Sequence, residues 1–364
     1  MFTILHTESS RGWGGQEIRI LKESLGMLSK GHRVIIAASE RSELYPRAKT
    51  AGIKVYPVSF VKKNPLSIAR TTSIINRESI DILNTHSSSD SWIATFGAKI
   101  AGNKPLILRT RHLSTPIGKS FLSRLIYEIL PDKVITTGEE IRQRMTKLNG
   151  FDGNKICSIP TGIDLNIFNP EKTIPCLEKT GFYIGMVSVL RSWKGHEYFI
   201  KAVPEILKSI PEAQFFIVGN GPQHENIRNL IKEMALGKKI LMLGHREDVP
   251  EIMASLDILV HSSYANEGVP QSILQALAMK KAIVASDAGA IREVILDGET
   301  GFLIKSRDHH LITDRVTHLY KNPELRIKLG ERGREMVHRN YSFEGMLDRI
   351  EALYRQLFEN KGME

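Results

Sequence analysis

A carboxylate, a glycine and a proline follow an apolar segment in the second half of the chain. Residues 257–261 read as a buried strand, and Glu267, Gly268 and Val269 then lead to Pro270, which we expect at the first position of an apolar-periodic helix. A helix that begins after a parallel strand exposes unpaired N–H groups at the positive end of its dipole. The segment therefore predicts a loop that binds a phosphate beside one carboxylate.

Gln275 lies eight residues after Glu267. That spacing corresponds to roughly 12 Å along a helix, because each helical residue adds about 1.5 Å. Glu267 and Gln275 would then reach hydroxyl groups on either side of a bound phosphate. We interpret the pair as recognition elements for a nucleoside diphosphate sugar.

Two cations and two glycines follow earlier strands of the same half. Arg191 and Lys194 come after an apolar strand at 182–189 and are suited to clamp a pyrophosphate, Lys as a compact charge and Arg as a planar fork. Arg191 also has a simpler interpretation as a surface loop charge. Gly219 and Gly221 end the next strand, where they keep the ligand side of the turn open or only shape the turn.

The first half of the chain places a glycine-rich turn and two histidines at the ends of predicted strands. Gly14, Gly15 and Gln16 follow the first strand and open a helix, a position that favours a bound anion. His86 and His112 each end a strand, and the ends of parallel strands line a ligand crevice. The alternatives are a plain tight turn for the glycines and a buried structural role for each histidine.

In chain order, these motifs resemble those of the retaining glycosyltransferases of family 4, which have the GT-B fold. The resemblance implies that Glu267 holds a hydroxyl of the sugar and Gln275 holds the ribose. It also implies that Lys194 and Arg191 hold the diphosphate, and that His112 steadies the charge that develops on the transferred sugar. The other implied site residues are Gly15, Gly219, His245, Gly268 and Val269 for the donor, and Gly14, Gln16, His86 and Arg111 for the acceptor or the cleft.

The chain departs from the family pattern at two positions. Family members carry a second Glu where Gln275 stands, and an Arg where Val189 stands. A Gln amide still accepts a hydrogen bond from a hydroxyl, but it loses the charge-assisted bond, which is about twice as strong as a neutral one. Arg191 is the expected substitute for the missing cation.

The order of elements predicts two α/β domains. Apolar runs alternate with helical patterns through both halves, as in doubly wound parallel sheets. The resemblance implies a GT-B fold, with two Rossmann-like doubly wound parallel-sheet domains facing a cleft. We expect an N-terminal acceptor-binding domain at 1–165, a nucleotide-sugar-binding domain at 166–340 and a C-terminal helix at 341–364 that crosses back to the first domain. Strands are expected at 2–7, 33–38, 53–58, 81–85, 105–110, 133–137, 182–189, 214–218, 239–243, 257–261, 282–285 and 302–304.

Length and composition restrict the class of protein. The 364 residues exceed the usual limit for one hydrophobic core. Cys157 and Cys176 are too few for a disulfide framework or a metal cluster, which favours a reducing compartment. The chain starts on an apolar strand without a signal-peptide pattern, and no apolar run approaches the roughly 18 residues of a membrane span. We therefore expect a cytoplasmic protein with at most peripheral membrane contact.

The positive charge is unevenly distributed. Residues 1–170 carry 24 Lys and Arg against 14 Asp and Glu, whereas residues 171–364 carry 26 of each kind. The excess favours an anionic partner for the first domain, either a phosphorylated acceptor or the inner face of an anionic membrane. Solvated charge without a partner is the simpler alternative, and the chain has no recognisable nucleic-acid motif.

The expected chemistry needs no metal and no cofactor. The sequence contains no Asp-x-Asp, no HExxH and no Cys pair with metal-ligand spacing. We expect a hexosyltransferase-type enzyme that moves a sugar with retention from a UDP- or GDP-linked donor to a cell-envelope glycan or glycolipid such as lipopolysaccharide. The alternatives are a nucleotide-sugar-binding GT-B protein without turnover and an epimerase-like GT-B enzyme.

Overall fold

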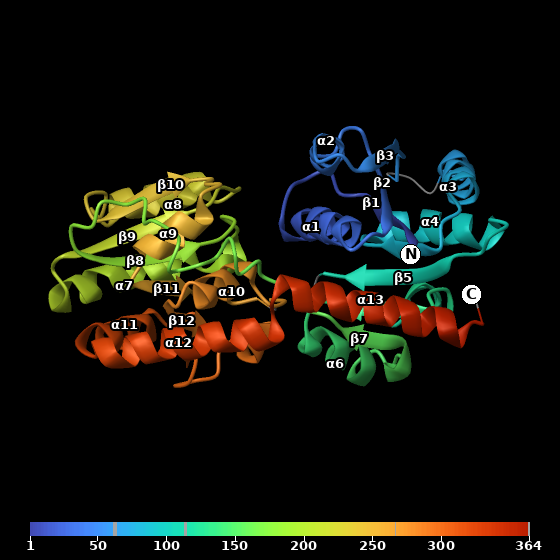
Figure 1. The fold of residues 1–364 in the computed structure, drawn as a ribbon. Coiled ribbons are helices and arrows are strands. Elements are labelled where there is room, and N and C mark those ends of the chain that lie inside the picture. The colour runs from blue at the N-terminus through green and yellow to red at the C-terminus, as the bar shows by residue number, and fades with distance from the viewer. Residues whose placement is uncertain (61–63, 113–114, 266, 363–364) are drawn as a thin grey trace. The chain divides into compact units, whose positions relative to one another are not determined.

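The chain divides into two compact units, each described here by itself (Figure 1). The computed structural model describes residues 1–60, 64–112, 115–265 and 267–362. Unit 1 comprises Met1–Thr161 and Glu344–Glu364, and unit 2 comprises Gly162–Phe343. The boundaries expected from the sequence fall a few residues from these positions.

Unit 1 contains a seven-stranded parallel sheet in the order β3-β2-β1-β4-β5-β6-β7. Because the order reverses between β1 and β4, the strand ends at this point open a crevice suited to ligands. The strands are β1 Thr3–Glu8, β2 Arg33–Ala38, β3 Lys54–Pro57, β4 Ile82–Thr85, β5 Leu106–Arg111, β6 Lys133–Thr136 and β7 Ile156–Ser158.

Helices cover both faces of this sheet. Neighbouring residues of β2 show the two faces, because Ile35 packs with residues of α3 and α4 whereas Ile36 packs with residues of α1 and α2. The helices of unit 1 are α1 Gly15–Ser29, α2 Leu44–Thr50, α3 Pro65–Glu78, α4 Ser88–Ile100, α5 Phe121–Arg124, the π-helical segment η1 Leu125–Ile129, α6 Glu139–Lys147, the 3₁₀ turn η2 Gly153–Lys155, and α13 Phe343–Asn360.

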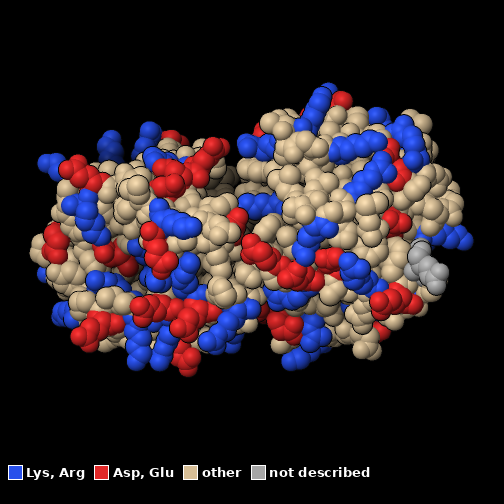
Figure 2. Space-filling model, in the orientation of Figure 1, with Lys and Arg blue, Asp and Glu red and all other residues tan. Residues whose placement is uncertain are grey.

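The last helix, α13, packs on unit 1 (Figure 1). Its apolar face includes Ile350 and Tyr354, both fully buried, and the Phe358 ring lies 4.8 Å from the ring of Phe2. Lys30, the C-cap of α1, forms ion pairs with Asp348 and Glu351 of α13. On the face shown in Figure 2, positive and negative side chains are intermixed along this helix.

Unit 2 contains a six-stranded parallel sheet in the order β10-β9-β8-β11-β12-β13, with the reversal between β8 and β11. Ile258 and Leu259 of β11 pack into separate cores on opposite faces. The strands are β8 Phe182–Val187, β9 Ala213–Val218, β10 Ile240–Gly244, β11 Ile258–His261, β12 Ala282–Ser286 and β13 Phe302–Ile304. The helices are η3 Ser192–Lys194, α7 His196–Ser209, α8 His224–Glu233, α9 Val249–Ser255, α10 Gln271–Ala278, η4 Gly289–Glu293, α11 His309–Lys321 and α12 Pro323–Asn340.

Two parallel sheets with helices on both faces confirm the predicted α/β class. The structure adds strand β7 and helix α2, which the sequence pattern did not predict. Strand β7 has three residues, and α2 has seven residues with a proline among them, so neither is long enough to show a clear hydrophobic period. Among the described residues, no helix is both long and apolar enough to cross a membrane.

Candidate functional site

Lys194 and Glu267 form an ion pair at the reversal point of the unit 2 sheet. The distance from Lys194 Nζ to Glu267 Oε1 is 2.7 Å, and the two side chains are only 16% and 13% exposed. The Ser263 hydroxyl also donates to Glu267 Oε1. Burial alone would raise the pKa of Glu267, but Lys194, His261 and Ser263 together hold it below its ordinary value. Glu267 is therefore an ionised acceptor near neutral pH.

The backbone joins the loop after β8 to the loop after β11. The Tyr264 N–H donates to the Trp193 carbonyl over 2.9 Å, and the Ser262 hydroxyl donates to the Gly195 carbonyl over 2.8 Å. Gly195 has a φ of +73°, and a Cβ atom there would lie 2.1 Å from the Ser262 carbonyl oxygen. Only glycine permits this approach, which brings Lys194 to Glu267.

The segment after Glu267 differs in detail from the expectation. Helix α10 begins at Gln271 and Pro270 is its N-cap, so the assignment of Pro270 to the first helical position was wrong by one residue. Residues 267–270 precede the helix, so the helical spacing of roughly 12 Å from Glu267 to Gln275 was also wrong. Glu267 remains fixed because its carbonyl accepts from the Ala290 N–H over 2.9 Å.

Gly268, Val269 and Gln275 are partly buried, and the first two directly precede α10. Val269 packs against the hydrophobic core beneath the helix, while Gln275 lies in the middle of α10 beside the fully buried Leu274 and Ala276. The first N–H groups of a helix have no partner within it, so this end is suited to an anion. The structure thus brings Lys194, Glu267 and the predicted helix start together.

Gly219 takes part in the same set of loops. It has a φ of +137°, and a Cβ atom there would lie 2.0 Å from the Ser188 carbonyl oxygen, so a larger residue does not fit. His245 follows β10 and is exposed. Arg191 is also exposed, and its guanidinium carbon lies 5.1 Å from the centre of the Trp193 ring rather than in the Lys194–Glu267 pair.

His261 is a candidate that the sequence analysis did not assign. It ends β11, it is 1% exposed, and neither ring nitrogen has a hydrogen-bond partner within the described part of the chain. Burial and the nearby Lys194 lower its pKa to about 4, although Glu267 opposes the shift. The strand-end rule that selected His86 and His112 would also have selected His261.

In unit 1, Gln16 lies in a cluster of polar groups beside the start of α1. Its side-chain amide donates to the Ser87 hydroxyl over 2.8 Å and to the carboxylate of Glu8, the last residue of β1. Burial raises the pKa of Glu8, while bonds from Ser87, Ser10 and Gln16 oppose the rise. The sequence did not single out Glu8, because it is the last residue of an apolar strand and meets its partners Gln16 and Ser87 only in the folded structure.

Gly14 and Gly15 hold the start of α1. Gly14 is the N-cap, and its N–H donates to the Glu17 carboxylate over 2.8 Å. A Cβ atom at Gly15 would meet no atom within 4 Å. The Glu17 carboxylate already satisfies one N–H group of this turn. Gln16 is the residue of the motif whose side chain reaches Glu8, at the end of β1, and Ser87, the N-cap of α4.

Three histidines form a hydrogen-bonded chain at the reversal point of the unit 1 sheet. His6 Nδ1 lies 2.9 Å from His86 Nε2, and His86 Nδ1 lies 2.9 Å from His112 Nε2. Burial lowers the pKa of each, and for His86 and His112 it falls well below the ordinary value. His112 is therefore neutral at neutral pH and acts through its ring nitrogens rather than through a charge.

The direction of the hydrogen bonds among these three histidines determines which ring nitrogen of His112 carries the proton. Each neutral imidazole has one N–H, so both bonds must run the same way. If His112 donated to His86 and His86 donated to His6, the one N–H of His6 would be on Nε2. That atom is buried and has no partner among the described residues. We therefore assign the opposite direction, in which His112 accepts at Nε2 and carries its proton on Nδ1.

Arg111 lies at the end of β5 and shares a partner with Arg109. The Tyr127 hydroxyl accepts from Arg109 Nη2 over 2.9 Å and from Arg111 Nη1 over 2.5 Å.

Asp90 accepts from the Thr7 hydroxyl and from the His86 backbone N–H. Burial and the neighbouring Glu8 raise the pKa of Asp90 to about 8, so it is largely protonated at neutral pH.

The described residues contain one cluster with the spacing of a metal site. Ligand atoms of Glu205, His309 and His310 lie within 4.8 Å of one another. His309 and His310 begin α11, and His310 Nδ1 lies 3.1 Å from a Glu205 carboxylate oxygen. None of these three residues takes part in the Lys194–Glu267 ion pair.

Comparison with known proteins matches both halves of the chain to glycosyltransferase families. Residues 13–167 match the family described as Glycosyltransferase Family 4, and residues 171–336 match Glycosyl transferases group 1. The UDP-Gal:alpha-D-GlcNAc-diphosphoundecaprenol alpha-1,3-galactosyltransferase of Escherichia coli is 27% identical over 317 residues, which are 82% of this chain and 81% of that protein.

Solved structures show the same fold over nearly the whole chain. A glycosyltransferase from Rickettsia africae has a TM-score of 0.89 at 24% identity, covering 99% of each chain. HepE of Anabaena, in complex with UDP and glucose, has a TM-score of 0.84 at 16% identity, covering 97% of this chain and 99% of its own. These similarities confirm the GT-B fold. The chain belongs to the group 1 glycosyltransferases of family 4.

Proposed function

We propose that this glycosyltransferase moves a hexose, with retention of configuration, from a UDP- or GDP-linked donor to a cell-envelope glycan or glycolipid. The observation that carries the proposal is the buried Lys194–Glu267 pair beside the start of α10. One cation, one ionised carboxylate and a helix N-terminus match the parts of a nucleoside diphosphate sugar. The UDP and glucose held by the Anabaena protein of the same fold support this class of donor.

Each donor residue has a defined task in this proposal. Glu267 accepts a hydrogen bond from a sugar hydroxyl, and Gln275 accepts one from the ribose. Lys194 has three N–H donors, so it can keep its bond to Glu267 and still bind an oxygen of the diphosphate. Gly268, Val269 and the helix start add backbone N–H groups, and Gly219 and His245 lie on the nucleotide side.

The transition state separates charge along the bond between the anomeric carbon and the phosphate. Lys194, with Arg191 and the N–H groups at α10, stabilises the negative charge on the leaving diphosphate, so the proposed reaction needs no metal ion. The neutral ring of His112 and the carboxylate of Glu267 interact with the sugar as positive charge develops on it. Attack on the leaving-group face gives retention, as the family assignment implies.

The acceptor is assigned to unit 1. Gly14 and Gln16 lie at the start of α1, His86 follows β4 and Arg111 ends β5, and the excess of cations is in the same half of the chain. The Escherichia coli relative acts on a sugar linked to diphosphoundecaprenol, which supports a lipid-linked acceptor. We place the reaction at the inner face of the membrane, with lipopolysaccharide precursors and other lipid-linked glycans as the acceptor class.

Gln275 and Val189 favour one rival function. Both replace charged residues of the family pattern, as expected for a protein that binds nucleotide sugars without turnover. The test is incubation of the protein with UDP- and GDP-sugars and a panel of lipid-linked acceptors, followed by measurement of released nucleoside diphosphate and of product. Release that depends on acceptor supports transfer. Saturable donor binding without release over the whole panel overturns the enzymatic proposal.

A further inference from the structure

A small cavity in unit 1 brings three cations together. It has a volume of about 210 Å³ and lies between the loop after β5 and helix α6. Arg111 and Lys119 line it from the loop side, and Arg144 lines it from the helix. The Asn149 side chain donates to the Ile117 carbonyl over 2.9 Å and fastens the loop to the end of α6.

The positive charge beside this cavity is poorly compensated. Arg109 is 5% exposed, and its Nε and Nη1 atoms have no partner among the described residues. The acceptors of Arg111 are the Tyr127 hydroxyl, which it shares with Arg109, and the carbonyl and hydroxyl of Thr115, none of which is a carboxylate. Both guanidinium groups lie over the Tyr127 ring. Burial lowers the pKa of Arg111, and Arg109 and Arg144 lower it further against the influence of Tyr127.

Nearby carboxyl groups offset little of this charge. Arg144 has an ion pair with Glu140 at the long distance of 3.4 Å. Asp90 lies near Arg109 but is largely protonated at neutral pH, as its raised pKa requires. A buried cation without a full set of acceptors, such as Arg109, is costly, and an anion bound at the neighbouring Arg111 and Arg144 would offset part of this positive charge.

Apolar side chains surround the cationic cavity. Ile117, Met145 and Leu148 line it, and Leu148 is 58% exposed. Helix α5 begins two residues after Lys119 with Phe121 and Leu122, which are 71% and 56% exposed. Large exposed apolar side chains beside a group of cations fit a ligand that has both an anionic head and a hydrocarbon chain.

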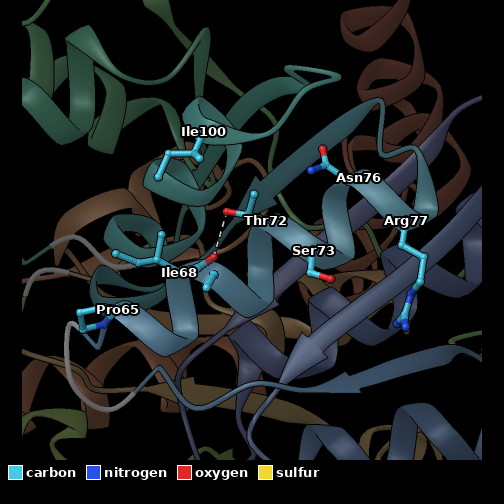
Figure 3. Close-up of a pocket in the computed structure, with 8 residues that line it drawn as sticks. Pro65, Ile68, Thr72, Ser73, Asn76, Arg77 and Ile100 are labelled. Carbon is cyan, nitrogen blue, oxygen red and sulfur yellow. Dashed lines mark hydrogen bonds between the residues drawn. The ribbon is translucent and has the colours of Figure 1, made fainter.

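A larger groove in the same unit lacks this combination. It has a volume of about 820 Å³ and runs along α3 beside Ile100 (Figure 3). Arg77 is the one cation among the described residues that line it, and it pairs with Glu78 at 3.5 Å and lies over the Tyr56 ring at 4.8 Å. The described lining of this groove therefore presents no uncompensated charge that would select a ligand.

We propose that Arg111, Lys119 and Arg144 bind the phosphate group of an amphiphilic acceptor, whose hydrocarbon chain lies against Leu148, Phe121 and Leu122. This inference rests on the proposed function, because it identifies the acceptor of that reaction as a lipid phosphate ester. Arg111 is a contact residue of the phosphate, and Arg109 is a positioning residue that acts through Tyr127.

The experiment measures calorimetric binding of farnesyl phosphate, farnesol and inorganic phosphate to the full chain. The test variants are Arg144→Gln, Lys119→Gln and Leu148→Ser. Arg142→Gln is the matched control, because Arg142 lies on the same helix, pairs with Glu139 and does not line the cavity. Thermal unfolding of every variant shows whether its fold is intact.

We expect farnesyl phosphate to bind at least tenfold more tightly than either farnesol or inorganic phosphate. Arg144→Gln and Lys119→Gln should each weaken the binding of farnesyl phosphate about tenfold and leave the binding of farnesol unchanged. Leu148→Ser should weaken the binding of farnesyl phosphate but not that of inorganic phosphate. Equal binding of farnesol and farnesyl phosphate overturns the proposal, as does equal weakening by Arg142→Gln. If inorganic phosphate binds as tightly as farnesyl phosphate, the cavity is only an anion site and the lipid assignment is overturned.

A second measurement separates this inference from the proposed function. Binding of UDP-glucose and GDP-mannose is measured on the same variants, because Lys194, Glu267 and Gln275, which are proposed to hold the donor, lie in unit 2. If the protein binds and turns over a donor but does not bind farnesyl phosphate, the glycosyltransferase proposal stands and the proposed acceptor subsite is wrong. Specific binding of farnesyl phosphate without donor turnover would leave the subsite and remove the transfer reaction.

Discussion

Lys194 and Glu267 are 73 positions apart in the sequence, yet their charged atoms lie 2.7 Å apart. Ser263 donates to the same carboxylate oxygen, and His261 lies close enough to lower the pKa of that carboxyl group. The pair fixes the position of an ionised carboxylate and leaves further Lys194 donors for a ligand. The first predictions concern these two residues.

Glu267→Ala should lower turnover by about 100-fold or more and leave the affinity for the free nucleoside diphosphate near the wild-type value. The reason is that Glu267 is proposed to hold the sugar, most tightly in the transition state. Steady-state kinetics and calorimetry with UDP or GDP measure the two effects. Ser263→Ala, which keeps the carboxylate, is the control. An equal loss of affinity for the free nucleotide would show that Glu267 does not act on the sugar.

Lys194→Gln should weaken binding of a nucleoside diphosphate about tenfold or more and leave binding of the free nucleoside unchanged. The substitution removes a charge-assisted bond to the diphosphate. Lys201→Gln is the control, because Lys201 forms a surface pair with Glu197. Activity should also persist in EDTA. A requirement for added Mg²⁺ or Mn²⁺ contradicts the proposed metal-free reaction.

Gln275→Glu should tighten binding of the nucleoside diphosphate and change turnover only modestly. A carboxylate forms a stronger hydrogen bond to a ribose hydroxyl than an amide oxygen does. Calorimetry with the nucleoside diphosphate and with its 2′-deoxy form measures the effect. If the substitution gives no tightening, or the same tightening for both ligands, Gln275 does not contact the ribose.

The buried His261 should make the stability of unit 2 depend on pH. Its folded-state pKa of about 4 lies below the ordinary value of 6.5, so the unfolded chain binds the proton more readily. The stabilisation is fully present above pH 6.5 and is lost as the pH falls from there toward 4. Between pH 7.5 and 5 the loss is roughly 2 kcal/mol, because each pKa unit corresponds to about 1.4 kcal/mol.

Urea unfolding of the wild type and of His261→Gln at these two pH values tests this prediction. The variant should show the smaller loss of unfolding free energy on acidification, whatever its stability at pH 7.5. His245→Gln is the control, because His245 is exposed. An equal pH dependence in the wild type and in His261→Gln would contradict the assignment.

The cations around α5 should bind the protein to anionic vesicles at low salt. Lys119 and Arg124 stand beside exposed apolar side chains, and each cation at an anionic surface contributes about 1 kcal/mol. Co-sedimentation with anionic and neutral vesicles at low and high salt measures binding. The double charge reversal Lys119→Glu with Arg124→Glu should abolish it. Absence of binding by the wild type at low salt removes the proposed membrane contact.

The sequence by itself determined the α/β class and the positions of most elements. Residues 34–38 and 282–285 are continuous apolar runs, because parallel strands are buried on both faces. The alternation of such runs with helical patterns can be recognised from the local sequence. Motif order also identified the family. The short β7 and α2 lacked enough residues for a period, so only the structure shows them.

Only the tertiary structure decided which side chains meet and what charge they carry. The strand order places β1 beside β4 and β8 beside β11, and this brings His6 to His86 and Lys194 to Glu267 across long stretches of sequence. Glu8 and Asp90 were not predicted as site residues, because a raised pKa depends on burial and on neighbours that no local pattern specifies. Residue type and spacing show which chemistry is available, whereas the packing of distant strands fixes distance and protonation.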